Sequence, residues 1–499
     1  MKKLKKDYFI FFGIFILAVI MYVGWISMHY SADTYNIMNV GYEKYATNWS
    51  LKDGRLVMYL LTMIFAKLNF PIEVYVIGTL VIAILISCAC VIKLKNIILK
   101  NTEINLKKEL IVTIAVFFTI FNFMYIEDMY FVESIVMALS LLLFTYSSDL
   151  IVNSKNLGNK FIALILTIFG VISYQGTAGF IIVLTFFISL LKNKIELNGN
   201  ADLIKKNIKQ ICLDTLISAF FALVAVGANM LIVNIIGNVT GQVQTRVGGI
   251  SSIFSNLQYI IRNFSVILKD NIGLFPTNLL YVFIAILLVC SLACDIKTKC
   301  QRFLTIKSIC IIVLCIICAF VVSLGTLSSF YTGRLHYCIG CIIGFVLICL
   351  IMENNDEIFI KIFNFILIIY SIVSIYNCII VTYEHKLVNE YEKDEVQGID
   401  EYINNYEQIS NVNIQNIAIY TVKGQDYKTY FENITRKSVV TYNAVRCDWA
   451  ADGVINFYTG RDLQKVNLTT NMLKEYLSQE NEEGYGIVNN TLIIECYMY

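Results

Sequence analysis

Charged side chains lie directly beside several long apolar stretches of this chain. Asp33 follows the first stretch, Glu127 and Asp128 follow a later one, and Arg334 and His336 precede another. Carboxylates can accept a proton from a hydroxyl, and guanidinium groups can bind phosphate through two parallel hydrogen bonds. Ionisable groups at membrane depth are costly, so those kept at helix ends become candidates for proton transfer and anion binding.

The composition shows what kind of chain must position these residues. Of its 499 residues, 57% are hydrophobic and only 15% are charged, and the mean hydropathy is +0.67. Soluble domains average about 25% charged residues, so the sequence predicts a polytopic membrane protein. The net charge of +2 gives no basis for a nucleic-acid partner. The basic start MKKLKK precedes an apolar run too long for a cleaved signal peptide, which predicts an uncleaved first helix.

Eleven membrane spans are predicted from stretches of about 20 apolar residues. They lie at residues 8–28, 73–92, 110–126, 131–152, 161–174, 177–191, 211–237, 275–294, 308–325, 335–352 and 358–381. The expected fold class is therefore an all-α polytopic membrane protein.

The segment 55–70 decides the predicted topology. It is apolar but short, contains Arg55 and Lys67, and is followed by Pro71. If it crossed the membrane, the lysine-rich connector 93–110 and two further basic loops would lie outside, against the positive-inside bias. We therefore expect an interfacial helix here, a cytoplasmic N-terminus and an extracytoplasmic C-terminus.

The last part of the chain changes in character from apolar to polar. A polar helical pattern follows the last span, the tracts QNIAIYTV and GIVNNTLIIECYMY predict strands, and AVRCDWAADGVINFYTG predicts a helix with a turn. We expect a transmembrane domain over residues 1–381 and a small extracytoplasmic α/β domain over residues 382–499. An oxidising compartment permits a disulfide between Cys447 and Cys496 without requiring one, so this pairing stays open.

The predicted outer loops gather the polar residues on one side of the membrane. Those residues are Asp33, Trp49, Asp53, Arg55, Glu127, Asp128, Glu133, Tyr174, Gln175, Tyr331, Arg334 and His336. Simpler explanations exist: Asp33 can cap the helix that starts there, Arg334 can reach lipid headgroups, and an acid such as Glu133 can be merely interfacial. Arg246 and Arg262, in another outer loop, are second-rank candidates for phosphate or headgroup binding.

The order of these features resembles a known family. The early acid Asp33 is followed by two predicted interfacial helices and an inward-returning span, with the tract W-x-x-x-x-GR at residues 49–55, SYQ at 173–175 and Arg334 in a late loop. In these features the chain is similar to the integral-membrane glycosyltransferases of the GT-C type that use a polyprenyl-phosphate sugar donor. It looks most like the type II serotype-converting O-antigen glucosyltransferases, over about residues 8–381.

The resemblance implies a role for each group. Asp33 is expected to be the general base that takes the proton of the acceptor hydroxyl. The donor phosphate is assigned to Arg334 first, Arg55 second and His336 as an auxiliary donor, although a lone histidine can also be structural. The residues assigned to the acceptor or the sugar are Glu127, Asp128, Tyr174, Gln175, Trp49 and Asp53. Glu127 and Asp128 are also the candidates for holding a divalent cation, Mg²⁺ or Mn²⁺. Ala32 precedes Asp33, so no adjacent acid pair stands in the first loop.

The implied activity is transfer of a hexose, expected to be glucose, from an undecaprenyl-phosphate-linked donor to a cell-surface glycan. It would take place on the outer face of a bacterial plasma membrane, with the lipid-linked donor, the glycan acceptor and membrane lipids as partners. One alternative is a surface-polysaccharide polymerase or lipid-linked ligase, which would rely on large arginine-bearing outer loops. Another is a flippase or transporter, which should show related halves and helices broken near the bilayer midplane. The acid in the first loop favours the transferase.

Overall fold

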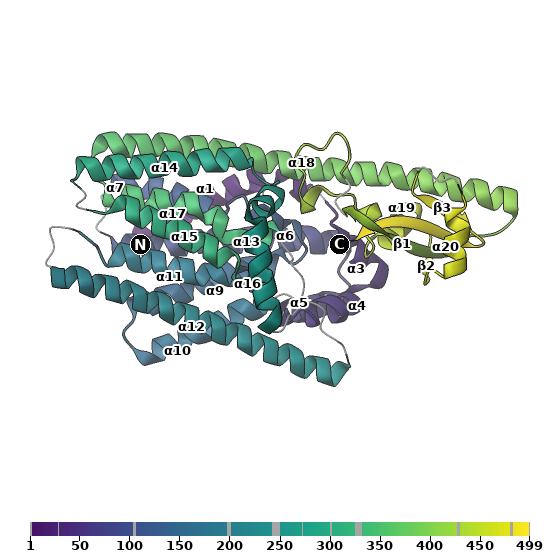
Figure 1. Ribbon diagram of the computed structural model, residues 1–499, viewed down its shortest axis with the longest axis horizontal. Coiled ribbons are helices and arrows are strands. Elements are labelled where there is room, and N and C mark those ends of the chain that lie inside the picture. Colours follow the sequence, from purple (N-terminus) through teal and green to yellow (C-terminus); the bar gives the residue numbers. More distant parts are fainter. Residues whose placement is uncertain are drawn as a thin grey trace.

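The protein is a bundle of long helices with a small sheet-containing unit at one end (Figure 1). The structure is a computed structural model, and it describes residues 2–27, 29–102, 106–196, 201–241, 250–271, 273–299, 302–324, 332–426, 430–479 and 483–498. Most of the helices run side by side along the longest axis of the molecule. Helix α13, Ile250–Asn271, instead crosses the bundle (Figure 1).

Eight helical segments within the described residues are long and apolar enough to cross a membrane. They are α6 (Ile72–Asn101), α9 (Ser134–Asn153), η2 with α11 (Gln175–Thr177 and Gly179–Lys192), α12 (Ala201–Thr240), α14 (Thr277–Lys297), α15 with α16 (Leu304–Ala319 and Val321–Leu324), η3 with α17 (Gly333–His336 and Tyr337–Glu353) and α18 (Glu357–Ser410). The chain is therefore a membrane protein.

The other three predicted spans also fold as helices, but they do not meet these criteria of length and composition. Their helices are α1 and α2 (Lys2–Met21 and Val23–Ile26), α7 and α8 (Leu106–Ile120 and Tyr125–Tyr130), and α10 (Leu157–Ser173). At 1.5 Å per residue α10 reaches only about 25 Å, somewhat less than a hydrocarbon core of about 30 Å. The structure thus supports eight spans directly, and eleven remains a prediction.

The connection between α2 and α6 contains four short helical segments. These are α3 (Ala32–Val40), α4 (Tyr42–Tyr45), the π-helical turn η1 (Ala46–Leu51) and α5 (Leu56–Leu68). Gly41, with φ of +82°, ends α3 and separates it from α4. The 13 residues of α5 extend about 20 Å, less than a hydrocarbon core of about 30 Å. The predicted place of this helix at the outer interface stays a prediction.

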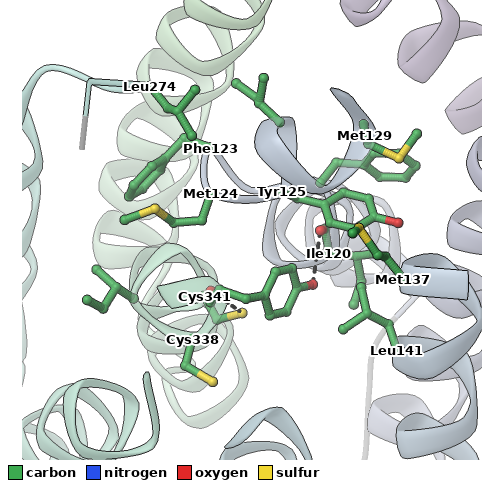
Figure 2. Packing of buried hydrophobic residues seen from close by; sticks show 14 of the residues in the cluster. Ile120, Phe123, Met124, Tyr125, Met129, Met137, Leu141, Leu274, Cys338 and Cys341 are labelled. Atoms are coloured by element: carbon green, nitrogen blue, oxygen red, sulfur yellow. Dashed lines mark hydrogen bonds between the residues drawn. The ribbon is translucent and has the colours of Figure 1, made fainter. Parts of the chain in front are cut away.

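Helix α17 forms the centre of the bundle. Figure 2 shows Cys338 and Cys341 of this helix in one cluster with Ile120 and Tyr125 of the neighbouring chain segment, and the Tyr337 hydroxyl donates to the Ile120 carbonyl oxygen at 3.0 Å. The helices approach closely because α17 presents glycines: a Cβ atom on Gly344 would lie 2.0 Å from Thr119 Oγ1. This packing fixes the segment 120–134, which carries several of the candidate site residues.

Lysines at one end of the bundle are paired with acids. The pairs are Lys6–Glu109, Lys93–Asp149, Lys95–Asp7, Lys297–Asp356 and Lys307–Glu353. The paired residues lie near the starts of α1, α7, α15 and α18 and near the ends of α6, α9, α14 and α17, so these lysine-bearing connectors meet at one end. We call this set of pairs the lysine end.

The C-terminal unit is built around a four-stranded mixed sheet. Its elements are β1 (Asn416–Asp426), η4 (Val439–Thr441), η5 (Ala444–Arg446), α19 (Ala451–Thr459), β2 (Gln464–Lys465), α20 (Thr470–Leu477), β3 (Tyr485–Val488) and β4 (Thr491–Met498). The strand order is β2-β1-β4-β3, with β1 parallel to β2 and β4 and with β3 antiparallel to β4. The predicted strands and helix of this region are confirmed. Cys447 and Cys496 are both buried free thiols.

Helix α18 joins the bundle to this unit without a break at residue 381. Its 54 residues extend about 80 Å, far more than a bilayer needs, so its polar second half projects beyond the apolar part (Figure 1).

Candidate functional site

The predicted site residues come together at the end of the bundle opposite the lysine end. Four regions meet there: the turn before α5, the segment α8 to α9, the end of α10 and η3. The polar site is defined by Asp53, Arg55, Glu127, Asp128, Glu133, Tyr174, Gln175 and Arg334.

Arg55 lies at the centre of one half of the polar site. Its guanidinium forms an ion pair with Glu133, lies 3.7 Å from Asp53 Oδ2, and lies 5.6 Å from the ring centre of Tyr174. Burial works against the charged form, but the carboxylates of Glu133 and Asp53 raise the pKa of Arg55 above its usual value. Gly54, with φ of +74°, makes the turn that presents Arg55 to these acids.

Arg334 and Glu127 form the other half. Arg334 Nε lies 3.6 Å from Glu127 Oε1, and its guanidinium lies 4.0 Å from the ring centre of Phe131. A Cβ atom on Gly333 would lie 2.8 Å from Glu127 Oε2, so the glycine lets the η3 backbone approach this carboxylate. Burial raises the pKa of Glu127, and the positive charge of Arg334 opposes this.

Asp128 is fully buried, and neither of its carboxylate oxygens has a hydrogen-bond partner within the described residues. Burial raises its pKa well above the usual value, the neighbouring Glu127 adds to this, and Arg334 opposes it. The Tyr174 hydroxyl and Gln175 Oε1 are likewise buried without a partner in this part of the chain. Buried polar atoms are normally hydrogen-bonded, and exceptions indicate strain, bound solvent or a ligand. Several such atoms beside two guanidinium groups indicate a site for a polar, anionic ligand.

Asp33 stands beside this cluster on α3. The N-cap of α3 is Ser31, whose hydroxyl accepts a hydrogen bond from the Thr34 backbone N–H at 3.2 Å. The explanation of Asp33 as the helix cap is therefore wrong, because a better capping residue precedes it. Burial, followed by the nearby carboxylates of Asp33 and Glu133, raises the pKa of Tyr45, so both acids lie near this phenol. The Tyr45 hydroxyl in turn donates to Glu133 Oε1 at 3.4 Å.

The remaining predicted residues have different placements. Gln175 Nε2 donates to the Asp53 carbonyl at 2.8 Å, which joins the SYQ tract to the first loop. His336 is buried against Phe320, with ring centres 4.8 Å apart, and Trp49 lies half-buried in η1. Arg262 is exposed on α13. Arg246 and Tyr331 lie outside the described residues.

No group of three or more metal-ligating side chains converges within the described ranges. Glu127 and Asp128 are therefore two adjacent oxygen donors without a third acidic, histidine or cysteine ligand from this part of the chain. Mg²⁺ is commonly bound by one or two carboxylates, with substrate phosphates and water completing its coordination shell, so these two acids stay the candidates for a cation.

Sequence reasoning undervalued Glu133. Taken as an interfacial acid, it is 1% exposed and forms the buried ion pair with Arg55. Its signal in the sequence was its place near the start of a predicted span, on the same predicted side of the membrane as Arg55. The contact between α3 and α19 was missed entirely, because it joins residues more than 400 positions apart.

The fold and the polar site define a polytopic membrane protein with a buried ionic site at one end of its bundle. A family model described as Glucosyl transferase GtrII matches residues 22–333, which is more than half of the chain. The chain belongs to this glucosyltransferase family, and the predicted resemblance to type II glucosyltransferases is confirmed. Among curated proteins, none is similar enough to the chain to give a match.

Proposed function

We propose that the protein transfers a glucosyl group from an undecaprenyl-phosphate-linked donor to a cell-surface glycan on the outer face of the membrane. Family membership supports membrane glucosyl transfer. The donor is inferred from the polar site, where Arg55 and Arg334 stand beside buried carboxyl and hydroxyl groups at the end of a helix bundle. This juxtaposition suits a ligand whose phosphate lies at the membrane surface and whose sugar carries several hydroxyls.

In the proposed reaction, an acceptor hydroxyl oxygen attacks C1 of the glucosyl group. The new bond joins that oxygen to C1, and the bond from C1 to the phosphate oxygen breaks. The Asp33 carboxylate takes the hydroxyl proton, and polyprenyl phosphate leaves with the electron pair of the broken bond. General-base help of this kind contributes about 10²- to 10⁴-fold to the rate.

Arg334 is the proposed partner of the leaving phosphate. Arg55 forms ion pairs with Glu133 and, at 3.7 Å, with Asp53, and Arg334 forms one with Glu127 at 3.6 Å. The stacking of Arg334 on Phe131 also fixes the plane of its guanidinium. Arg55 then orients the site through Glu133 and contributes positive potential. His336, packed on Phe320, remains a proposed auxiliary donor.

The unpartnered groups of the polar site are proposed to bind hydroxyls. Asp128, Gln175 Oε1 and the Tyr174 hydroxyl offer acceptors or donors within one buried cluster, and Glu127 lies beside them. Asp53 and Trp49 belong to the first loop, where we propose contact with the acceptor. We further propose that this end faces outward and that the lysine end faces the cytoplasm, following the positive-inside bias.

Transfer of label tests the proposal directly. Membranes containing the protein are incubated with labelled polyprenyl-phosphate glucose, and label in surface glycan is measured for wild type and for Asp33→Asn. The matched control is Glu43→Gln, which neutralises an exposed acid in the same loop. We expect wild-type and Glu43→Gln proteins to transfer label and Asp33→Asn to lose at least 10²-fold in rate. Full activity of Asp33→Asn would remove the proposed base, and absence of transfer by folded wild type would remove the proposed donor and acceptor.

A further inference from the structure

The C-terminal unit lies beyond the family match, which ends at residue 333, and it contacts the helix that carries Asp33. We propose that this unit positions Asp33 for the reaction, because packing of α19 against α3 holds the helix that carries Asp33 in place. The inference rests on the proposed function, in which Asp33 is the base. It assigns Asn39, Asp452 and Gly453 as positioning residues.

The contact between α3 and α19 is close and specific. Asn39 Nδ2 donates to Asp452 Oδ2 at 2.8 Å, and Asn456 Nδ2 donates to Asn39 Oδ1 at 3.1 Å. A Cβ atom on Gly453 would lie 2.4 Å from the Tyr35 carbonyl oxygen. Only glycine therefore lets the two helix backbones approach to this distance, and α19 is the principal neighbour of α3 (Figure 1).

Tyr35 connects the same helix to α18. Its side chain is fully buried, and its hydroxyl lies 2.9 Å from the Tyr458 hydroxyl and donates to Glu392 Oε2 at 3.1 Å. The other oxygen of Glu392 accepts the Ala444 backbone N–H at 2.6 Å. One carboxylate therefore ties α3 to the entry of the C-terminal unit.

The residues leading into α3 are also held from α18. Tyr30 exchanges two hydrogen bonds with the side chain of Asn389, each 2.9 Å long. His385 Nε2 lies 3.2 Å from the Tyr30 carbonyl oxygen. The backbone three residues before Asp33 is thus fixed by a helix that continues into the C-terminal unit.

These contacts matter because α3 cannot hold its own position. It has nine residues, between the cap at Ser31 and the left-handed Gly41, and isolated helices shorter than about 12–15 residues are marginal. Its placement therefore depends on what packs against it. A displacement of about 1 Å at a catalytic group can reduce a rate about 10²-fold, so loss of the α19 contact should act on turnover.

The first test is Gly453→Ala in the full chain, with kcat and KM measured for labelled polyprenyl-phosphate glucose. Alanine favours helix more than glycine does, so α19 itself should not be weakened. The added Cβ must instead push the α3 backbone away at Tyr35. The matched control is Gly398→Ala on α18, where no atom lies within 4 Å of the new Cβ. We expect Gly453→Ala to lower kcat about tenfold or more with KM changed less than about twofold, and Gly398→Ala to match wild type.

The second test exchanges the polar pair. Asn39→Asp places two carboxylates against each other and should lower kcat, whereas Asn39→Asp with Asp452→Asn restores a hydrogen bond and should recover most of it. This rescue would not follow from a general loss of folding. Two results would overturn the inference: a wild-type kcat in folded Gly453→Ala, or no rescue in the double variant. In either case the proposed function would still stand if Asp33→Asn is inactive. If Asp33→Asn is itself fully active, the proposed function fails.

Discussion

The two ends of the helix bundle differ in whether their buried charged groups have partners. At the lysine end, Lys95 is fully buried, yet its ammonium lies 2.6 Å from Asp7 and 3.7 Å from Glu109. At the polar site, Asp128 is equally buried, but its two oxygens have no hydrogen-bond partner within the described chain. A protein that needed only stable helix ends would satisfy both in the same way.

We propose that the difference separates structural charges from functional ones, although Asn96 Oδ1 and Thr305 Oγ1 near the lysine end also lack a partner within the described residues. Each acid at the lysine end neutralises a cation on a neighbouring helix, which fixes how the helices meet. At the polar site the arginines and acids are also paired, but the Tyr174 hydroxyl and Gln175 Oε1 are buried without a hydrogen-bond partner within the described residues. Leaving such groups without partners costs about 1–3 kcal/mol each, a cost that binding of a polar ligand would remove.

Loss of Arg334 should produce the largest effect. Arg334→Gln removes the charge that we assign to the leaving phosphate, and the rate of transfer should fall about 10²- to 10³-fold. The measurement is kcat with labelled polyprenyl-phosphate glucose. Arg262→Gln, an exposed arginine on α13, serves as the control and should retain the wild-type rate. Equal rates for Arg334→Gln and wild type would remove the phosphate assignment.

Breaking an ion pair at each end should distinguish the two kinds of charge. Arg55→Met leaves Glu133 buried without its partner, and removing one member of a buried pair costs about 3–5 kcal/mol of stability. We expect a lower melting temperature and a lower kcat in the protein that remains folded. Lys95→Met should also reduce stability, by about 1.5–3 kcal/mol because its partner Asp7 is partly exposed, but should leave kcat unchanged. A loss of kcat in folded Lys95→Met would contradict the distinction.

Asp128 should affect stability rather than rate, and the effect should be visible as a pH dependence of the melting temperature. Because its folded pKa is raised, mainly by burial, the stability that it contributes is full below the unfolded pKa of about 4 and is lost as pH rises toward the folded pKa. The loss is limited to about 1.4 kcal/mol per pH unit. Wild-type protein without donor should therefore lose thermal stability between pH 5 and pH 8 relative to Asp128→Asn. If the melting temperatures of wild type and Asp128→Asn changed in parallel with pH over this range, burial would not affect the ionisation of Asp128.

The sequence predicted the membrane class, the segment 55–70 as a short helix and the strands of the C-terminal unit. These follow from local apolar length, charge bias and alternation, which act over a few residues. It did not predict Ser31 as the cap in place of Asp33, because the two candidates stand only two positions apart. It also did not predict the pairing of Arg55 with Glu133 or of Asn39 with Asp452. Such contacts depend on how distant segments pack, which a single sequence does not encode in any local pattern.

Photo-crosslinking of the donor tests the central claim most directly. A photoreactive polyprenyl-phosphate glucose analogue, with its reactive group beside the phosphate, is bound to the full-length protein in membranes and the labelled peptides are mapped. We predict labelling of peptides that contain residues 125–134 and 332–337, reduced by Arg334→Gln and competed by unlabelled donor. Labelling confined to the connectors of the lysine end, such as residues 93–102, would contradict the assignment of the polar site.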